Sequence, residues 1–145
     1  MQPISAVALF CEDIRDEKSG AQTLIGIFPD NADVPAFPCT FSRLGLYLRI
    51  HIDPAFDPHS LSLVLRMPSG QEQVVAELGR ELIDKGRREA EDSQSPLIGF
   101  ISRTIVRDFT ISGPGRIAAV VKVGEREILA GALNIQQIPP GKIVS

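Results

Sequence analysis

The amino-acid sequence predicts an all-β protein: an immunoglobulin-like antiparallel β-sandwich of about seven or eight strands with one short helix. First, apolar and polar residues alternate strictly from Leu44 to Ile52, which is typical of a strand with one buried face. Second, turn sequences containing glycine or proline separate the successive apolar runs. The chain has 145 residues, of which 43% are hydrophobic, so it can form a core without a metal or a disulfide.

Two strands are predicted near the N-terminus. The apolar runs Ile4–Asp13 and Thr23–Phe28 are rich in β-branched and aromatic residues, and a polar segment separates them. Pro29, Pro35 and Pro38 then predict an irregular connection that also includes Asp30 and Asn31, because each proline fixes φ and lacks a backbone donor.

The middle of the chain continues the β pattern. The strand Leu44–Ile52 directs alternate aliphatic residues into the core, and Leu61–Met67 repeats that pattern after a loop with the sequence DPAFDPH. The turn Pro68–Gly70 leads into a third strand, Gln71–Leu78. We therefore expect three antiparallel strands to follow one another in this part of the chain.

One segment departs from the β pattern. Residues 79–95 are rich in helix formers and charges, which predicts a short surface helix at about residues 80–92 that crosses between the two sheets. Its apolar stripe consists of Leu78, Leu82 and Ile83. Gly86 weakens the middle of the helix, and the charges are expected to face solvent. A mobile charged loop is the alternative.

Three strands are predicted in the C-terminal part. The long run Leu97–Ile111 is followed by Arg116–Val123 and Arg126–Ile135. Gly124 and Glu125 separate the last two strands and suit a two-residue type II′ hairpin turn. Without an internal repeat or a linker, residues 1–145 are expected to form one domain.

Composition limits the classes of partner. The net charge of −3 and the pI near 5.4 argue against nucleic acid and against an anionic membrane surface. The opening residues lack the basic region of a signal peptide, so Cys11 and Cys39 are expected to be reduced thiols of a cytoplasmic protein.

One short stretch holds both histidines of the chain. The sequence HIDPAFDPH contains His51, Asp53, Asp57 and His59, and a His-x-Asp pair can supply two ligands of an iron site. Because both aspartates precede prolines, a surface turn with two solvated histidines is the preferred interpretation. We therefore predict no catalytic residues and no cofactor, and keep a metal- or small-ligand-dependent enzyme at this loop as the alternative.

Three segments carry a resemblance to a known family: CEDIRDEKSG from Cys11, TLIGIFPD from Thr23, and GPGRIAAVVKVGEREILAGALNI from Gly113. They resemble a family of small uncharacterised bacterial proteins, a domain of unknown function, and the last segment has the form of an immunoglobulin-like closing hairpin. The resemblance implies a fold and no activity. The motif positions expected to be structural are Cys11, Glu12, Asp13, Arg15, Gly26, Asp30 and Gly115.

Local chemistry gives some of these positions a role. Asp13 can accept backbone N–H groups in the turn after the first strand, and Arg15 can pair with Asp13 or Glu17. On the long strand from Leu97, Arg103 and Arg107 share one face with Ile105, which suggests an exposed sheet face or an oligomer contact.

Two functional hypotheses follow from the sequence. The first is a non-catalytic module that binds an unknown protein partner or a second copy of itself, through an outer sheet face or exposed strand edges. The second is the enzyme built around the loop from His51 to His59.

Overall fold

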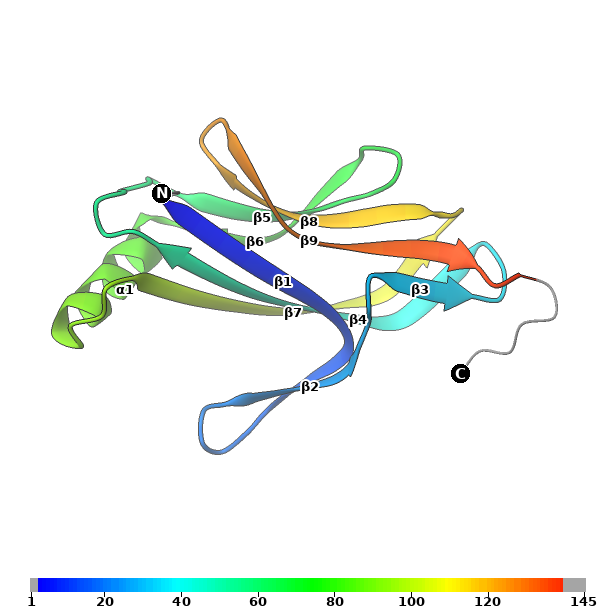
Figure 1. Cartoon of the computed structure of the whole chain (residues 1–145), viewed down its shortest axis with the longest axis horizontal. Coiled ribbons are helices and arrows are strands. Elements are labelled where there is room, and N and C mark those ends of the chain that lie inside the picture. Colours follow the sequence, from blue (N-terminus) through cyan, green and yellow to red (C-terminus); the bar gives the residue numbers. More distant parts are fainter. Residues whose placement is uncertain (1–2, 140–145) are drawn as a thin grey trace.

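The predicted all-β sandwich is confirmed by a computed structural model, which describes residues 3–139 (Figure 1). Two sheets with nine strands in total and one helix form the described part of the chain. The elements are β1 (Ile4–Asp16), β2 (Gln22–Ile27), β3 (Asn31–Val34), β4 (Cys39–Ile52), β5 (Leu61–Arg66), β6 (Glu72–Leu78), α1 (Arg80–Asp92), β7 (Ile98–Ile111), β8 (Gly115–Val123) and β9 (Arg126–Gln137).

The first sheet has four strands in the order β2-β1-β4-β7, and all its pairs are antiparallel. Its longest pair joins β4 to β7, from Cys39 opposite Ile111 to Ile52 opposite Ile98. The distal part of the β1–β2 hairpin bends back beneath the first sheet in the view of Figure 1, and Asp16 in it lies 3.0 Å from Arg103 of β7. This hairpin therefore lies over part of the outer face of the first sheet, where Cys11 is fully buried.

The second sheet has five strands in the order β3-β9-β8-β5-β6. Here the structure corrects one expectation, because Asn31–Val34 is strand β3 rather than part of an irregular connection, and it pairs in parallel with β9. The segment contains no proline and buries Ala32 and Val34. The prolines that predicted irregularity lie on either side of it.

The core lies between the sheets and consists mainly of leucine, isoleucine and valine. The predicted alternation in β4 is confirmed, since Leu44, Leu46, Leu48, Ile50 and Ile52 are all at most 3% exposed. Residues from the second sheet complete the same cluster, including Leu63 and Leu65 of β5, Val121 of β8 and Leu133 of β9. Burial of these side chains is the main force that holds the two sheets together.

The turns follow the predicted glycine positions. Val123 pairs with Arg126, so Gly124 and Glu125 form a two-residue hairpin loop. Gly124 has a φ of +59° and Glu125 does not have a positive φ, as a type II′ turn requires.

The charged segment after β6 forms helix α1, which links the second sheet to the first at one end of the sandwich (Figure 1). The predicted apolar stripe is wrong in part, because Leu82 is 49% exposed and the buried residues are Ile83, Gly86 and Ala90. A Cβ atom at Gly86 would lie 2.6 Å from Cζ of Phe100. Glycine therefore lets the helix approach β7 closely. None of the helical structure within residues 3–139 is long and apolar enough to cross a bilayer.

Candidate functional site

The structure does not gather the four residues of the HIDPAFDPH stretch into one site. His51 is half-buried in β4, opposite Ser5 and Gly99, whereas His59 is exposed. The Asp53 carboxylate accepts the N–H of Ala55 at 2.8 Å and shapes the turn. Within residues 3–139, no group of three or more His, Cys, Asp or Glu side chains could hold a metal ion.

Asp57 has a structural partner in helix α1. Its carboxylate lies 2.7 Å from the Arg80 guanidinium and 3.0 Å from that of Arg87. The same two arginines donate to the carbonyls of Pro58 and Pro54, at 3.0 Å and 2.7 Å. The hydrogen bond from Arg80 is the main cause that lowers the pKa of Asp57. The expectation that the charges of the helix face only solvent is therefore wrong for these two arginines, which fasten the helix to the loop.

The motif residues of β1 take part in ion pairs around the hairpin. Arg15 pairs with Glu17 at 2.9 Å, one of its two predicted partners. The Glu17 carboxylate also accepts the hydroxyl of Thr23 at 2.9 Å, across the hairpin. Asp13 lies within β1 rather than in the turn after it, so the predicted turn role is wrong; its carboxylate accepts the N–H of Ile14 at 2.9 Å and forms an ion pair with Arg43 of β4 at 2.6 Å. That pair across two strands is not visible in the sequence.

Three further motif positions lie where the backbone is constrained. Gly26 has a φ of +64°, and a Cβ atom there would lie 2.6 Å from Cδ of Glu12. The backbone carbonyl of Asp30 accepts the N–H of Asn134 at 2.9 Å beside β3. Gly115, at the start of β8, has a φ of +154°.

Both thiols are free, and Cys11 is fully buried although it lies on the outer side of the first sheet. It pairs with Gly45, where a Cβ atom would lie 2.7 Å from Sγ of Cys11. Burial raises the pKa of the Cys11 thiol, and the nearby Asp13 and Glu12 charges act in the same direction. The thiol is thus held in its unreactive protonated form. Cys39 is half-buried against the core.

The outer face of the first sheet carries an unusual concentration of exposed apolar side chains. Five of the nine large hydrophobic residues exposed in residues 3–139 lie here, with exposed fractions between 39% and 60%. They are Val7, Leu9, Ile25, Ile27 and Ile101. We call this surface the basic–apolar face and define it by these residues with Tyr47, Ile105 and four arginines, Arg43, Arg49, Arg103 and Arg107.

Strand register arranges the basic–apolar face in rows across the sheet. In one row Arg49 lies between Val7 and Ile101, and in the next Tyr47 lies between Leu9 and Arg103. A third row runs from Ile27 through Cys11 and Gly45 to Ile105. The last row places Ile25, Asp13, Arg43 and Arg107 in succession. Val7 and Leu9 are therefore neighbours on one side of β1, whereas Arg49 of β4 separates Val7 from Ile101 of β7.

The arginines of the basic–apolar face differ in their partners. Arg43 pairs with Asp13, and Arg103 pairs with Asp16 at 3.0 Å. Arg49 and Arg107 form no ion pair with any residue from 3 to 139. The predicted sharing of one face by Arg103, Ile105 and Arg107 agrees with this register.

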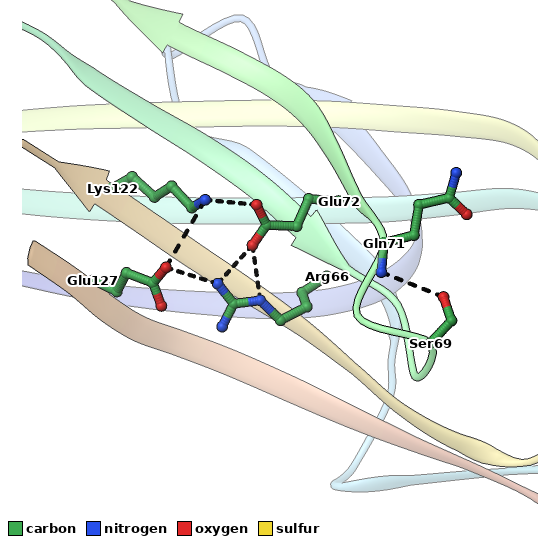
Figure 2. Close-up of polar contacts among 6 residues, drawn as sticks. All are labelled: Arg66, Ser69, Gln71, Glu72, Lys122 and Glu127. Atoms are coloured by element: carbon green, nitrogen blue, oxygen red, sulfur yellow. Dashed lines mark hydrogen bonds and ion pairs between the residues drawn. The ribbon is translucent and has the colours of Figure 1, made fainter. Parts of the chain in front are cut away.

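The outer face of the second sheet is different, because its charges neutralise one another (Figure 2). Arg66 lies 2.6 Å from Glu72 and 2.9 Å from Glu127, and Lys122 lies 2.5 Å from Glu72. Lys122 and Arg66 lower the pKa of Glu72, and the Lys122 hydrogen bond is the larger cause. Two cations thus face two carboxylates. This face needs no external ion to balance its charge.

A groove of about 380 Å³ lies between the edge strands β6 and β7. It reaches Leu48, Leu61 and Leu63 of the core, which are already at most 3% exposed. Its lining also includes Ile101, which is 53% exposed and belongs to the basic–apolar face, so the groove adjoins that face. The basic–apolar face has more exposed apolar side chains than this groove.

Sequence reasoning missed the apolar part of this surface, although a signal was present. Strand β1 is apolar on both sides, with Ala8 and Phe10 facing the core and Val7 and Leu9 facing outward. A strand that is apolar on both sides is typical of a sheet with both faces covered.

These features define an all-β sandwich in which the outer face of one sheet carries exposed apolar side chains together with arginines. Residues 6–136 match the model of DUF6941, a family of unknown function, and the chain belongs to this family. The resemblance to a family of unknown function is thereby confirmed. Comparison with curated proteins gives no match, and comparison with solved structures gives none either.

Proposed function

We propose that the protein is a non-catalytic module that binds another protein through the basic–apolar face. The single observation that carries this proposal is that Val7, Leu9, Ile27 and Ile101 all remain exposed on one face of the first sheet, with Val7 and Leu9 adjacent on the same side of β1. Isolated exposed apolar residues are normal on protein surfaces, but a contiguous group is typical of an interaction site.

Full burial of a valine, leucine or isoleucine side chain is worth about 1.5–3 kcal/mol. The side chains of this face are between 39% and 60% exposed, so covering each one contributes on the order of 1 kcal/mol. Because the backbone is already ordered in a four-stranded sheet, a partner meets a preformed surface.

The finer features of the proposal are an immunoglobulin-like arrangement of the sheets and a cytoplasmic location, in a bacterial protein. The closing β8–β9 hairpin supports the first feature, and the two free thiols support the second. The alternative enzyme at the loop from His51 to His59 has less support, since Asp57 is held by Arg80 and Arg87.

A matched pair of variants tests the proposal. Val7 on the basic–apolar face is 60% exposed, and Val74 on the outer face of the second sheet is 56% exposed. Tagged wild-type protein, Val7→Glu and Val74→Glu are each used to capture binding proteins, which are then quantified by mass spectrometry. We expect Val7→Glu to reduce recovery of the partner at least tenfold and Val74→Glu to retain it. Retention by Val7→Glu, or equal loss with both variants, would overturn the proposal.

Light scattering on the same proteins examines self-association. We expect no dimer that depends on Val7. A wild-type dimer that Val7→Glu dissociates would assign the face to a second copy of the chain and overturn the choice of another protein.

A further inference from the structure

We infer that the β1–β2 hairpin is a strap that restrains access to the basic–apolar face, and that it swings away when a partner displaces Asp16 from Arg103. This inference rests on the proposed function and adds regulation to the same surface. It follows from the place where the hairpin leaves the sheet, from the residues that it covers and from the contacts that hold it.

The hairpin leaves the sheet at Cys11. The ladder between β1 and β4 runs from Ile4 opposite Ile52 as far as Cys11 opposite Gly45, and within residues 3–139 the segment Asp13–Asp16 pairs with β2 alone. The hairpin lies beneath the first sheet in Figure 1, and β1 contacts β7 although β4 separates these two strands in the sheet. The distal hairpin can therefore move without breaking a hydrogen bond between β1 and β4.

The base of the hairpin contains a glycine that suits a hinge. Gly26 of β2 has a φ of +64°, a conformation that favours glycine, and it lies beside Glu12 of β1. The N–H of Phe28 donates to the carbonyl of Phe10 at 2.8 Å and holds the chain just before the hairpin departs. Rotation about Gly26 and Glu12 would move the distal hairpin and leave this hydrogen bond in place.

The base of the hairpin also covers the middle of the basic–apolar face. Cys11 is fully buried on this outer side, and a Cβ atom at Gly45 would lie 2.7 Å from its Sγ atom and 3.4 Å from Cδ1 of Ile105. Ile105 is half-buried, whereas Ile101 further along β7 is 53% exposed. A partner that meets the closed hairpin therefore reaches Ile101 but not the surface around Gly45.

Two ion pairs attach the distal hairpin to the sheet, from Asp13 to Arg43 and from Asp16 to Arg103. The side chains of Asp16 and Arg103 are 63% and 51% exposed, and ion pairs of this kind stabilise little and weaken in salt. The hairpin is also incompletely packed, since two isoleucines of β2 remain 42% and 51% exposed. The closed position is therefore weakly held.

The same arginines couple the strap to binding. Arg43 and Arg103 belong to the basic–apolar face, so a partner that engages either guanidinium competes with the hairpin carboxylate that holds it. Binding then selects the open position, and the apparent affinity of the partner falls in proportion to the fraction of molecules that are open. Weakening the attachment should therefore strengthen binding.

Labelling of Cys11 measures the opening of the hairpin, because this thiol is buried at its base. Ellman's reagent is applied to a parent protein that carries Cys39→Ser, so that Cys11 is its one thiol. Asp16→Asn in this parent releases the ion pair with Arg103. Asp13 is left unchanged, because its charge raises the pKa of the thiol and would alter the labelling rate by itself.

Two further variants are controls. Glu17→Gln removes a carboxylate of the same hairpin whose partners, Arg15 and Thr23, also lie in the hairpin. The double variant Asp16→Arg/Arg103→Asp exchanges the two charges and lets the ion pair form again.

We expect Asp16→Asn to be labelled at least threefold faster than the parent, and Glu17→Gln and the charge-exchanged variant to be labelled at the rate of the parent. Added salt should accelerate labelling of the parent more than that of Asp16→Asn. In the capture experiment, Asp16→Asn should recover at least twofold more partner than wild type when the tagged protein is limiting, and Glu17→Gln should recover the wild-type amount.

Equal labelling of Asp16→Asn and the parent would overturn the inference, as would equally fast labelling of Glu17→Gln or failure of the charge exchange to slow the reaction. Faster labelling without greater recovery of the partner would also overturn it, because the hairpin would then move without restraining binding.

Failure of the strap and failure of the proposed function give different results. If Val7→Glu loses its captured protein while Asp16→Asn changes neither labelling nor recovery, the binding face stands and the strap is wrong. If Val7→Glu keeps its captured protein, the proposed function is wrong, and the hairpin has no binding site there to restrain.

Discussion

Arg43 of β4 and Arg107 of β7 lie directly opposite each other in the four-stranded sheet, and only Arg43 has an ion-pair partner within residues 3–139. Like charges at opposed positions destabilise a sheet. The sequence therefore keeps a locally unfavourable pair on the surface to which we assign binding. A role of Arg107 in binding a partner, and not in stabilising the fold, would explain this arrangement.

The first prediction concerns this pair. Arg107→Gln should raise the free energy of unfolding by about 0.2–1 kcal/mol, because it removes the repulsion from Arg43. Urea denaturation measures the change. Arg49→Gln is the control, since the opposed positions there hold Val7 and Ile101, and it should give no such gain. A lower stability for Arg107→Gln would show that the pair is not repulsive.

The second prediction concerns the two thiols. In the native protein, Ellman's reagent should modify Cys39 before Cys11, because Cys11 is fully buried and burial raises its pKa. In urea both thiols should react rapidly. The variant Cys39→Ser should therefore lose the faster native phase, and rapid labelling of that variant under native conditions would contradict the described burial of Cys11.

The third prediction concerns the contact between α1 and β7. Alanine is the better helix former by about 1 kcal/mol, yet Gly86→Ala should lower the free energy of unfolding by about 1–3 kcal/mol. The added methyl group would meet the Phe100 ring at 2.6 Å. Gly113→Ala is the control, since a Cβ atom there has no heavy atom within 4 Å outside its chain neighbours.

A double variant checks the cause. Phe100→Leu combined with Gly86→Ala should cost less than the sum of the two single changes, because the shorter side chain makes room for the methyl group. If the losses in free energy of unfolding were additive, the destabilisation by Gly86→Ala would not come from contact with Phe100.

The fourth prediction concerns acid stability. Hydrogen bonding to Arg80 lowers the folded-state pKa of Asp57 below its ordinary value of 3.8. The resulting stabilisation is present above 3.8 and is lost as the pH falls through the lower folded pKa. Asp57→Asn should therefore be less stable than wild type at pH 7, and the difference should shrink in acid well below pH 3.8. Urea denaturation at several pH values follows this difference.

Asp92→Asn supplies the control for that series, because Asp92 forms no ion pair within residues 3–139. It should show no comparable loss at pH 7. A constant difference between wild type and Asp57→Asn across the whole pH range would contradict an ionic role for Asp57.

Much of the fold could be predicted from local patterns. The alternation from Leu44 to Ile52 identifies both the strand and its buried side, because successive side chains of a β-strand point to opposite faces of the sheet. The hairpin at Gly124 was predictable for a similar reason, since few residues tolerate its positive φ. The helix could be placed by composition, but its buried side depends on Gly86 meeting Phe100.

Other features depend on tertiary contacts that no local pattern encodes. Strand β3 forms because β9 offers a free edge, and their pairing joins residues about one hundred positions apart, such as Asn31 and Asn134. In β7 the buried positions change phase near Asp108, whose φ is +51°, so that Phe109 joins the core while Arg107 stays exposed. A pure alternation rule would not place this change.

Part of the basic–apolar face could be predicted from the sequence. The shared face of Arg103, Ile105 and Arg107 follows from spacing along one strand. The contribution of Val7, Leu9 and Ile27 requires knowing that β1 and β2 lie in the same sheet as β7. Strand order is the information that the sequence lacked.

Photo-crosslinking from two matched positions tests most directly whether the basic–apolar face binds another protein. Ile101 on the basic–apolar face is 53% exposed, and Leu129 on the outer face of the second sheet is 54% exposed. Benzoylphenylalanine is placed at position 101 or at position 129, and crosslinked products are identified by mass spectrometry after irradiation in cells. Our account predicts a crosslink to another protein from position 101 and none to that protein from position 129. Crosslinking of that protein from position 129 alone, or equally from both positions, would contradict it.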